Sequence, residues 1–465
     1  MSAKHGDVSP TMARLSAYIA DALTTALPDQ VVEKTKAHLL DTIASMVSGA
    51  LLAPGKLAIG YVRSQVGARE AQIITTNTLT TATHAAFANA MLAHADETDD
   101  SHMTSRAHMG CSVIPAALAV AERDNVAGAL LLRAIALGYD VGSRVLFALN
   151  PLAFHQAGHC THSFAGIFGA TAATTALARL SPQQAAWTLS YAAQQAAGIT
   201  SWRRGADHVE KAFVFAGLPA RNAVEATAMV SAGFGGVNDV FFGRPNFFDV
   251  FGQEPTPELL VNELGERHEI LNTTIKKWTV GSPAQSVLDG VQALLKKHTF
   301  DCRDIREITI RMTPLEIDTV DNRDIADISL QYLVALLLID KELTFASSHD
   351  DRRMADPAVL ALKQMVKLTA DPERERRRAH VLISLRSGQA LSHQSGPVRG
   401  SPANPMTHDE VTSKALDLMS PLLGVGTAGR LIHAIWNIDE LDTVRELRKL
   451  CTLPPRSAHR KHVIR

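Results

Sequence analysis

Small and apolar residues recur at helical spacing through the first half of the chain, and this pattern constrains the fold more than any other feature. From residue 11 to about residue 230 the sequence is rich in Ala and Leu, and one apolar stripe holds Val31, Val32, Leu39, Leu40, Ile43, Ala44 and Val47. Stretches such as AGIFGATAATTALA (165–178) place Ala and Gly where neighbouring helices can approach closely. The pattern predicts a stack of helices that bury one another on more than one side.

The pattern changes between about residues 273 and 394. REITIRMT (306–313) and HVLISLRSG (380–388) alternate apolar and polar residues with a period of two, which is typical of strands with one covered face. The segments 284–297 and 330–340 return to helical spacing, so helices are expected to cover one side of the strands. A turn-rich stretch with three prolines and two glycines follows, HQSGPVRGSPANPM (393–406), and it is typical of a hinge or linker.

Residues 407–450 are again helical in pattern, with Thr407 or His408 before an acidic first turn. We expect this segment to rejoin the first helical unit. The predicted fold class is therefore mainly α. A large, discontinuous helical domain is expected to comprise residues 1–272 and 401–465, and a smaller α/β lid domain is expected to comprise residues 273–400.

Composition and charge limit what the chain can bind. The 465 residues carry 46 Lys plus Arg against 47 Asp plus Glu, so a formal net charge of −1 offers no long-range attraction to nucleic acid or an anionic membrane. We find no signal-peptide pattern and no window apolar enough for a membrane span. The four cysteines form no CxxC pair of the kind that holds zinc or an iron–sulfur cluster. We expect a cytoplasmic protein that uses no metal or other cofactor.

The densest polar segment is HADETDDSHMTSRAHMG (94–110), which places three histidines, four acids and one arginine in 17 residues beside an apolar helical run. Such clusters favour shifted pKa values, although a solvated loop that caps the next helix has the same composition. The spacings match no closed metal-ligand pattern such as HExxH. A second segment, FHQAGHCTHSFAG (154–166), holds three histidines, and His162 is the favoured catalytic candidate because its small neighbours would let a ligand approach.

Two further segments supply cations. SWRRGADHVEKAF (201–213) carries two arginines and a lysine between aromatic residues, which indicates partial burial and stronger anion binding, although most such runs are ordinary surface charge. NTTIKKWTVGSPAQS (272–286) places two lysines before a Gly-Ser-Pro turn whose exposed amides would favour a carboxylate. The P-loop and the GxSxG hydrolase motif are absent, and GFGG (233–236) is not a dinucleotide-binding fingerprint.

These segments, in this order, resemble the MmgE/PrpD family, which includes 2-methylcitrate dehydratase, cis-aconitate decarboxylase and iminodisuccinate epimerase. The similarity covers nearly the whole chain, with further matches at GIFGA (166–170), AFVFAGLPARNA after Lys211, SLQYLVALLLID (329–340) and GSPANPMT (400–407). The resemblance implies a helical large domain, an α/β lid and an active site between them. It also implies a metal-free homodimer that acts on a small carboxylate substrate.

Together, the segments and the resemblance predict the functional residues. The expected reacting and charge-stabilising groups are His108, Asp99, Asp100, His162, Lys211, Lys276 and Tyr332. The expected substrate contacts are Glu97, Ser101, His102, Arg106, His159, Arg203 and Gln285. The chain departs from the family's usual residues at Glu97 (often Asp), Cys160 (often His), Val214 and Gln285 (often His).

Removing a proton next to a carboxylate creates an enediolate-like dianion, so the site must offer a base, an acid and cations. His108 with Asp99 or Asp100 would supply an oriented imidazole, and Lys211, Lys276 and Arg106 the positive charge. We expect a cofactor-independent lyase, either a dehydratase or a decarboxylase, that acts on a di- or tricarboxylate such as 2-methylcitrate or cis-aconitate. The alternatives are an epimerase of an imino- or amino-dicarboxylate such as iminodisuccinate, and a family member that only binds carboxylates.

Overall fold

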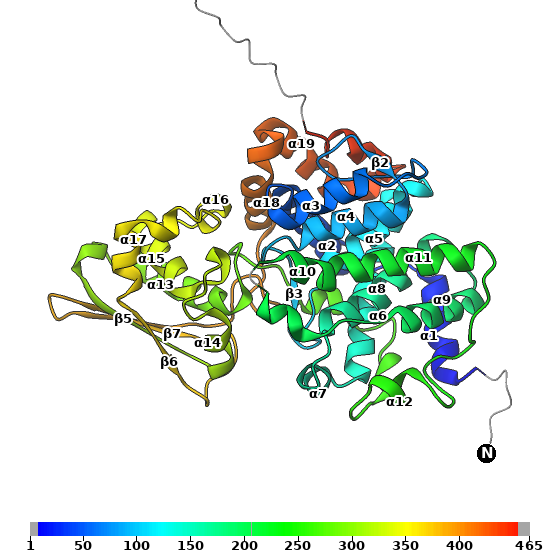
Figure 1. Cartoon of the computed structure of the whole chain (residues 1–465), viewed down its shortest axis with the longest axis horizontal. Helices are drawn as coiled ribbons and strands as arrows, with labels where there is room; N and C mark the ends of the chain where they lie inside the picture. Colours follow the sequence, from blue (N-terminus) through cyan, green and yellow to red (C-terminus); the bar gives the residue numbers. More distant parts are fainter. Residues whose placement is uncertain (1–7, 206, 454–465) are drawn as a thin grey trace, which may run out of the picture.

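Two lobes meet near the middle of the molecule, as Figure 1 shows. The computed structural model describes residues 8–205 and 207–453. The larger, helical lobe contains α1 (Pro10–Asp21), α2 (Asp29–Gly49), α3 (Ala53–Arg63), β1 (Ala71–Gln72), β2 (Leu79–Thr80), α4 (Ala82–Ala93), β3 (Ser101–His102), α5 (Gly110–Arg123), α6 (Gly128–Ala148), α7 (Pro151–Gln156), α8 (Thr161–Leu177), α9 (Pro182–Gln195), α10 (Val209–Ala212), α11 (Leu218–Ser231), α12 (Phe247–Phe251), β4 (Thr273–Thr274), α18 (His408–Leu423) and α19 (Val425–Trp436). The smaller lobe, called the lid lobe below, contains α13 (Gln285–Lys297), β5 (Ile305–Met312), α14 (Pro314–Val320), α15 (Leu330–Asp340), α16 (Phe345–Ser348), α17 (Pro357–Lys363), β6 (Val366–Ala370), β7 (His380–Leu385) and β8 (Ala390–Gln394).

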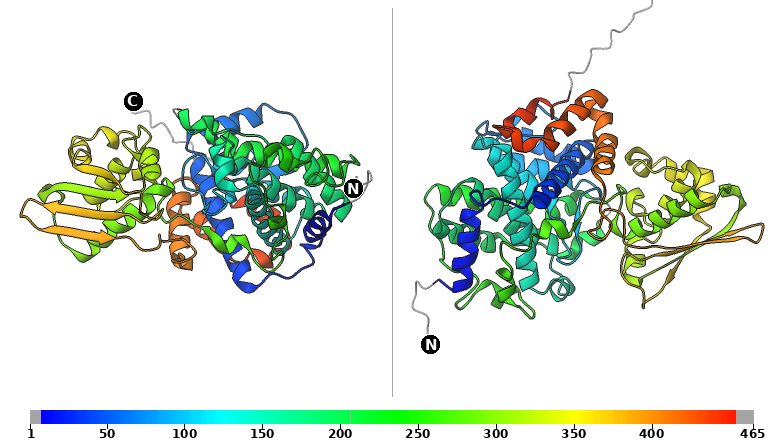
Figure 2. Two further views of the ribbon diagram at one scale, coloured as in Figure 1. Left: turned by 90° about the horizontal axis from the view of Figure 1, so that it is seen from below. Right: turned by 180° about the vertical axis from the view of Figure 1, so that it is seen from behind.

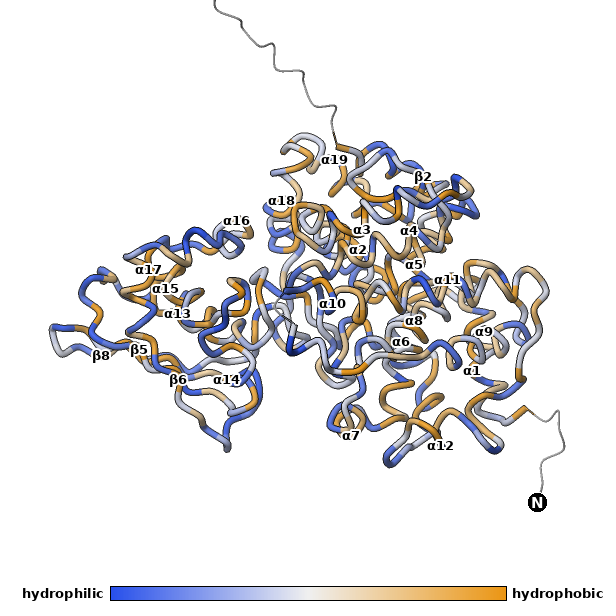
Figure 3. The backbone as a smooth tube through the Cα atoms, in the orientation of Figure 1, coloured by the Kyte–Doolittle hydropathy of each residue, from blue (hydrophilic) through white to orange (hydrophobic). Residues whose placement is uncertain are grey.

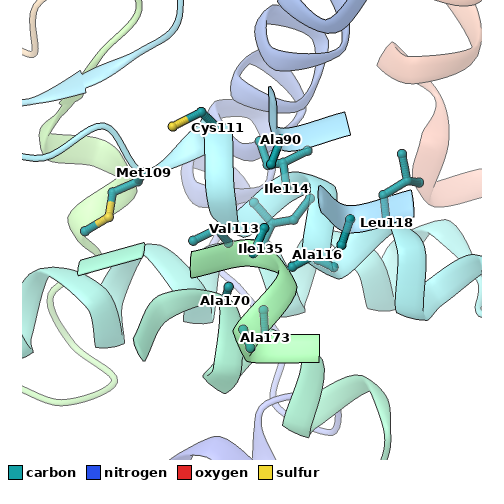
Figure 4. Close-up of a cluster of buried hydrophobic side chains, with 14 of the residues drawn as sticks. Ala90, Met109, Cys111, Val113, Ile114, Ala116, Leu118, Ile135, Ala170 and Ala173 are labelled. Carbon is teal, nitrogen blue, oxygen red and sulfur yellow. The ribbon is translucent and has the colours of Figure 1, made fainter. Parts of the chain in front are cut away.

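The predicted fold class, mainly α with a smaller α/β unit, is confirmed. Small residues let the central helices cross closely, because a Cβ atom on Gly138 of α6 would lie 2.9 Å from the carbonyl oxygen of Gly169 of α8. A Cβ on Gly169 would lie 2.5 Å from the carbonyl oxygen of Gly138. Figure 4 shows Ala170 and Ala173 of α8 facing Val113 of α5 in this core, and Figure 3 shows apolar residues along the interior helices.

The C-terminal helices pack on the helical lobe. In both views of Figure 2, as in Figure 1, α18 lies beside α2, and the side chains of Val411, Leu418 and Ile435 belong to the same apolar core as the first helices. Thr407 caps α18 in a capping box, in which its hydroxyl accepts a hydrogen bond from the backbone N–H of Glu410. Apolar burial, together with this cap, therefore holds α18 and α19 against the first helices of the lobe.

The lid lobe is a four-stranded sheet in the order β6-β5-β7-β8, in which β5 is parallel to β6 and antiparallel to β7. Residues along β7 alternate between buried and half-buried, as the period of two predicted, because α13 and α15 cover one face. Leu288 of α13, Leu333 of α15, Ile310 of β5 and Ile383 of β7 share the lid core. The outer end of the β7–β8 hairpin is hydrophilic (Figure 3).

The two chain crossings between the lobes run side by side. The backbone N–H of Ile275, on the first crossing, donates to the carbonyl oxygen of Gly400 on the second, at 3.2 Å. Gly400 has a φ of +95°, and a Cβ there would lie 1.8 Å from the carbonyl oxygen of Ile275, so only glycine fits. In addition, β4 pairs with β3 through Ser101 and Thr274. The polar segment 94–110 is thereby attached to the junction between the lobes.

The fold also bears on two other possibilities, a membrane-spanning helix and a dinucleotide-binding loop. No single helix within the described residues is both long and apolar enough to cross a membrane; α2 and α3 would pass that test as a pair only across an 83° bend. GVGTAG (424–429) has the spacing of a dinucleotide-binding loop, but Gly424 lies between α18 and α19 and the other five residues begin α19, so the element before them is a helix and not a strand.

Candidate active site

A cleft of about 970 Å³, its open mouth included, lies between the lobes. The helical lobe contributes one wall, and the lid lobe contributes the other through residues such as Pro283, Glu316 and Arg377. The predicted site residues that line this cleft are Glu97, Ser101, His102, Arg106, His108, His162, Arg203 and Lys211. Four separate segments of the helical lobe therefore converge on one cavity.

His108 is held by a buried carboxylate. Its Nδ1 lies 3.1 Å from Oδ1 of Asp99, and Nδ1 of His94 lies 3.0 Å from the same oxygen. Burial opposes ionisation of Asp99, but the imidazoles of His108 and His94 outweigh it and hold the pKa of Asp99 well below its usual value. Because the carboxylate has no proton to donate, Nδ1 of His108 carries the hydrogen. In the neutral ring, Nε2 then has a free lone pair.

His162 has the opposite arrangement. Its Nδ1 accepts a hydrogen bond of 3.2 Å from the backbone N–H of His108, so its Nε2 carries the hydrogen when the ring is neutral. Burial and the nearby imidazoles of His108 and His94 hold the pKa of His162 well below its usual value, so the ring is neutral. The ring centroids of His108 and His162 are 4.9 Å apart. The cleft therefore places a proton-accepting imidazole beside a hydrogen-donating one.

An irregular helix positions the aromatic wall behind these rings. Phe215 lies in a π-helical segment, Phe213–Gly217, which joins α10 to α11. Its ring stacks on His162 with centroids 3.6 Å apart and on His94 with centroids 4.6 Å apart. π-Helical turns are rare and occur often at functional sites. Here the wider turn allows one phenylalanine to pack between two imidazoles.

Two lysines and a glutamate form the charged floor of the site. Nζ of Lys276 donates to the carbonyl oxygen of Glu97 at 2.6 Å and lies 3.9 Å from Oδ1 of Asp99. Nζ of Lys211, in α10, contacts the carboxylate of Glu97. Burial lowers the pKa of Lys211 to about 7. Lys211, Lys276 and His108 therefore lie around the neighbouring acids Glu97 and Asp99.

Asp100 is predicted to react, but the structure places it behind the cleft. Its carboxylate lies 2.8 Å from Nδ1 of His38, accepts a hydrogen bond from the Tyr139 hydroxyl, and accepts one of 3.1 Å from the backbone N–H of Gly110. A Cβ on Gly110 would lie 2.6 Å from Oγ1 of Thr42, so this packing is tight. Asp100 anchors the start of α5, two residues after His108, and does not face the cleft.

Asp99 and Lys276 also lie behind the cleft, in contact with His108 and Glu97, which line it. Three further predicted site residues lie elsewhere. The hydroxyl of Tyr332 is turned into the lid lobe, where it donates to the carbonyl oxygen of Ser347 at 3.0 Å. The ring of His159 stacks on Phe154, with centroids 4.4 Å apart, and packs against two other phenylalanine rings of the helical lobe. Gln285 is buried, and its amide donates to the backbone carbonyl of Trp278 at 2.8 Å, so it shapes the loop before α13 and lines only an adjoining cavity.

His102 and Ser101, two predicted substrate contacts, line the cleft and are held by neighbouring residues. Nδ1 of His102 lies 2.7 Å from the hydroxyl of Ser105, and its Nε2 lies 3.2 Å from the carboxylate of Glu269. The backbone of Ser101 is paired with Thr274 across the β3–β4 ladder. These contacts fix the loop that carries Asp99 and His108.

Several residues at the site are not among those predicted from the sequence. His155, Phe215, Arg376 and Arg377 line the cleft, and His94 lies directly behind it. The two arginines belong to the run RERRR (374–378), which has the composition of an ordinary solvated surface. No local pattern distinguishes such a run from one that faces a cleft, because the distinction depends on how the lid lobe meets the helical lobe.

Two groups of side chains have the composition of a metal site. Ligand atoms of His94, Asp99 and Cys111 lie within 4.8 Å of one another, as do those of Asp96, Asp327 and His349. Burial raises the pKa of the Cys111 thiol well above its usual value, which disfavours the thiolate that a metal requires. In the second group the imidazoles of His349 and His208 already balance the two carboxylates.

Asp96, His208, Asp327 and His349 form a buried ion cluster that joins the lobes. Nε2 of His349, in the lid lobe, lies 2.9 Å from Oδ2 of Asp96 in the helical lobe. Nε2 of His208, in the helical lobe, lies 3.4 Å from Oδ1 of Asp327 in the lid lobe. Burial opposes all four charges, but their mutual attraction outweighs it, so the pKa values of both histidines are raised and those of both aspartates are lowered.

The stability of this interlobe contact should therefore depend on pH. A raised histidine pKa contributes stability below the unfolded value of about 6.5 that is lost as pH rises through the folded pKa. A lowered aspartate pKa contributes stability above about 3.9 that is lost in acid. We expect His349→Gln to destabilise the protein by about 1.5–3 kcal/mol near pH 5.5 and by progressively less at higher pH. Urea unfolding across this pH range measures the difference, with His433→Gln, at an exposed histidine of α19, as the control. A pH-independent difference would contradict the prediction.

Comparison with known proteins gives the family. Residues 13–260 match the family model for the MmgE/PrpD N-terminal domain, and residues 278–440 match that for the MmgE/PrpD C-terminal domain. The chain belongs to the MmgE/PrpD family. The unmatched residues between these two MmgE/PrpD domains include the first crossing between the lobes, with β4 and Lys276.

The chain is also similar over most of its length to proteins named as decarboxylases. The chain is 22% identical to a cis-aconitate decarboxylase of Aspergillus terreus (strain NIH 2624 / FGSC A1156) over 490 residues, which cover 98% of this chain and 99% of that protein. It is 24% identical to a cis-aconitate decarboxylase-like protein of Aspergillus oryzae over 324 residues, which cover 65% of this chain and 66% of that protein. These similarities support an enzyme of the lyase type.

Proposed function

We propose that this protein is a cofactor-independent lyase that acts on a small di- or tricarboxylate. The observation that carries the proposal is a pair of imidazoles beside Lys211 in one cleft. In the neutral rings, the hydrogen is on Nδ1 of His108 but on Nε2 of His162. Lyases of this kind must handle a proton at a carbon next to a carboxylate without a metal or an organic cofactor. The pair offers a site for accepting that proton and a site for stabilising the negative charge that results.

His108 is the proposed base. Asp99 accepts the hydrogen bond from Nδ1, which leaves Nε2 free to accept a proton and stabilises the imidazolium that forms. A dehydration then proceeds as the C–H bond next to the carboxylate breaks toward Nε2. Its electron pair forms the new C=C bond, and the hydroxyl group leaves as water after it receives a proton.

Lys211 is the proposed proton donor. Its pKa of about 7 is close to neutral pH, where an acid is most effective at giving up a proton in the transition state. His162 is neutral, so its Nε2–H donates a hydrogen bond to the developing oxyanion rather than a proton. Lys276, fully buried against Glu97 and Asp99, adds a fixed positive charge to the same region.

A decarboxylation uses the same groups in another order. The C–C bond to the departing carboxylate breaks, CO₂ leaves, and the electron pair passes through the adjacent double bond to a carbon that takes a proton from a protonated group such as Lys211. The named relatives are cis-aconitate decarboxylases, which favours cis-aconitate as the first substrate to test. The dehydration of a hydroxy acid such as 2-methylcitrate is the second.

The test is proton NMR of the purified protein in deuterium oxide with cis-aconitate, citrate, 2-methylcitrate and iminodisuccinate in separate samples. The proposal predicts new alkene signals from at least one tricarboxylate, with CO₂ release for a decarboxylase. Deuterium exchange in iminodisuccinate without a new C=C bond would instead support the epimerase alternative. The absence of both conversion and exchange in every sample would reject catalysis and leave the binding-only alternative.

A further inference from the structure

Arginines from both lobes line the cleft in excess of the acids that could neutralise them. Arg106 and Arg203 come from the helical lobe, and Arg376 and Arg377 come from the loop between β6 and β7 in the lid lobe. Their mutual repulsion contributes to lowering the pKa of Arg106, after burial, which places these charges near one another. A cluster of cations around a partly buried cavity is stable only when anions offset the repulsion.

The acids in the cleft wall are already paired. Glu97 is paired with the two lysines, since its carboxylate contacts Lys211 and lies 3.7 Å from Nζ of Lys276. Glu316 pairs with Arg377 through Nη1 at 2.7 Å and accepts a second bond from the Arg377 backbone N–H at 3.0 Å. Glu97 and Glu316 are the acidic residues that line the cleft among the described residues. Arg106, Arg203 and Arg376 are left without a carboxylate there.

Each of these three guanidinium groups lacks a partner that would neutralise it within the described part of the chain. The Nε atoms of Arg106 and Arg376 are buried and form no hydrogen bond within the described part of the chain. Nη2 of Arg203 lies 2.6 Å from Nε2 of His155, and burial together with Arg203 lowers the pKa of His155 to about 4, so that contact adds no compensating charge. Unsatisfied buried donors are costly, which makes them a receptor for an acceptor group on a ligand.

The backbone adopts an unusual conformation at Arg106 and at Arg377, the neighbour of Arg376. Arg106 has a φ of +56°, and its carbonyl oxygen accepts a hydrogen bond of 2.6 Å from the hydroxyl of Thr161. Arg377, next to Arg376, has a φ of +61° and is fixed by Glu316. A non-glycine residue in the left-handed region costs about 1 kcal/mol, and such strain is concentrated at ligand sites. Arg376 is therefore supported on a loop whose shape is already set.

We infer that Arg106, Arg203 and Arg376 bind a carboxylate of the substrate that takes no part in bond breaking. This inference rests on the proposed function, which identifies the ligand as the substrate. His108, His162 and Lys211, which act on the reacting carbon, all belong to the helical lobe, whereas Arg376 belongs to the lid lobe. A substrate with a second, remote carboxylate is therefore bound by both lobes at once, and a monocarboxylate is bound by only part of the site.

Calorimetric titration of the full-length protein with propane-1,2,3-tricarboxylate and with butyrate tests the inference. The tricarboxylate carries no hydroxyl group and no double bond, so its binding is measured without turnover. Arg376→Gln and Arg203→Gln should each weaken tricarboxylate binding by about 10- to 100-fold and change butyrate binding less than about threefold, because a hydrogen bond to a charged group contributes about 1.5–3 kcal/mol.

Two neighbouring arginines provide matched controls. Arg204 is exposed beside Arg203. Arg374 pairs with Asp371 on the same loop as Arg376. Arg204→Gln and Arg374→Gln should bind the tricarboxylate within about threefold of the wild type, which is under 1 kcal/mol. Wild-type affinity in both Arg376→Gln and Arg203→Gln would overturn the inference, as would an equal loss in the control variants.

Comparing binding with conversion separates this inference from the proposed function. His108→Gln should retain tricarboxylate affinity, because it removes only the base. If the wild type converts no carboxylate but Arg376→Gln still loses tricarboxylate binding, the proposed function fails and the receptor stands. If the wild type converts a tricarboxylate while Arg376→Gln binds and converts it normally, the receptor fails and the proposed function stands.

Discussion

Replacing His108 with alanine should lower the turnover of the converted carboxylate by about 10²- to 10⁴-fold, the usual contribution of a general base. The loss is expected in kcat more than in KM, because His108 acts on the reacting carbon and the cations that bind the carboxylates remain. Steady-state kinetics with the substrate identified by NMR measures it. Calorimetric binding of propane-1,2,3-tricarboxylate shows whether the cleft is intact.

His159→Ala is the matched control for this prediction. Both variants remove one imidazole, but the ring of His159 stacks on Phe154 and does not line the cleft. Its loss should change turnover less than about tenfold, with any larger effect traceable to lost stability. Equal activity of His108→Ala and the wild type would contradict the assignment of the base.

Asp99→Asn gives an independent check on the same step. An asparagine amide can donate to Nδ1 of His108, which would move the imidazole hydrogen to Nε2 and remove the proton-accepting position. Turnover should then fall by an amount comparable to that in His108→Ala, although the imidazole is still present. A variant that folds and keeps wild-type turnover would show that the Asp99 contact, 3.1 Å from Nδ1, does not orient the base.

Lys414→Met should destabilise the protein by about 3–5 kcal/mol at pH 8, the usual cost of leaving a buried charge without its partner. Nζ of Lys414, in α18, lies 2.7 Å from Oδ1 of Asp41 in α2 and donates to the carbonyl oxygen of Thr98 at 3.1 Å. Both side chains are buried. The contact therefore joins the C-terminal helices, the second helix and the segment that carries Asp99.

The pH dependence of this effect has a definite sign. Burial raises the pKa of Asp41 to about 6 even with Lys414 present. Because this folded value lies above the unfolded value of about 3.9, the aspartate destabilises the fold as pH rises and is neutralised in acid. Loss of Lys414 raises the folded pKa further, so Lys414→Met should lose more stability near pH 8 than near pH 5.

Urea unfolding at both pH values measures this difference. Lys297→Met, at an exposed lysine of α13, should change stability by less than about 0.5 kcal/mol. Combining Lys414→Met with Asp41→Leu should recover much of the loss, since an apolar pair can replace a buried ion pair. A pH-independent loss, or none, would show that the Lys414–Asp41 contact does not stabilise the fold.

The fold class and several elements followed from local patterns in the sequence. Alternation in residues 306–313 and 380–388 corresponds to β5 and β7, and the helical spacing of 330–340 corresponds to α15. These patterns are readable because a helix and a strand each repeat their side-chain direction every few residues. The segment 94–110 was likewise identified from composition, and its residues His108 and Arg106 do line the cleft.

Other features arise only from contacts between residues far apart in the sequence. Lys276 reaches Glu97 across 179 positions, and this contact distinguishes a buried lysine behind the cleft from a surface pair. Tyr332 and His159 match expected site positions, yet Tyr332 is buried in the lid lobe and the ring of His159 stacks on Phe154 outside the cleft. Arg376 has the local sequence of a solvated surface, but the lid lobe carries it to the cleft.

The chain's periodicity thus prescribes its helices, its strands and the places where reactive side chains gather. Packing of the two lobes decides which of those side chains share a cavity, which nitrogen of each imidazole carries the hydrogen, and which charges lack a partner. The physical reason is that burial and electrostatic pairing depend on distance in space, which local sequence spacing does not encode.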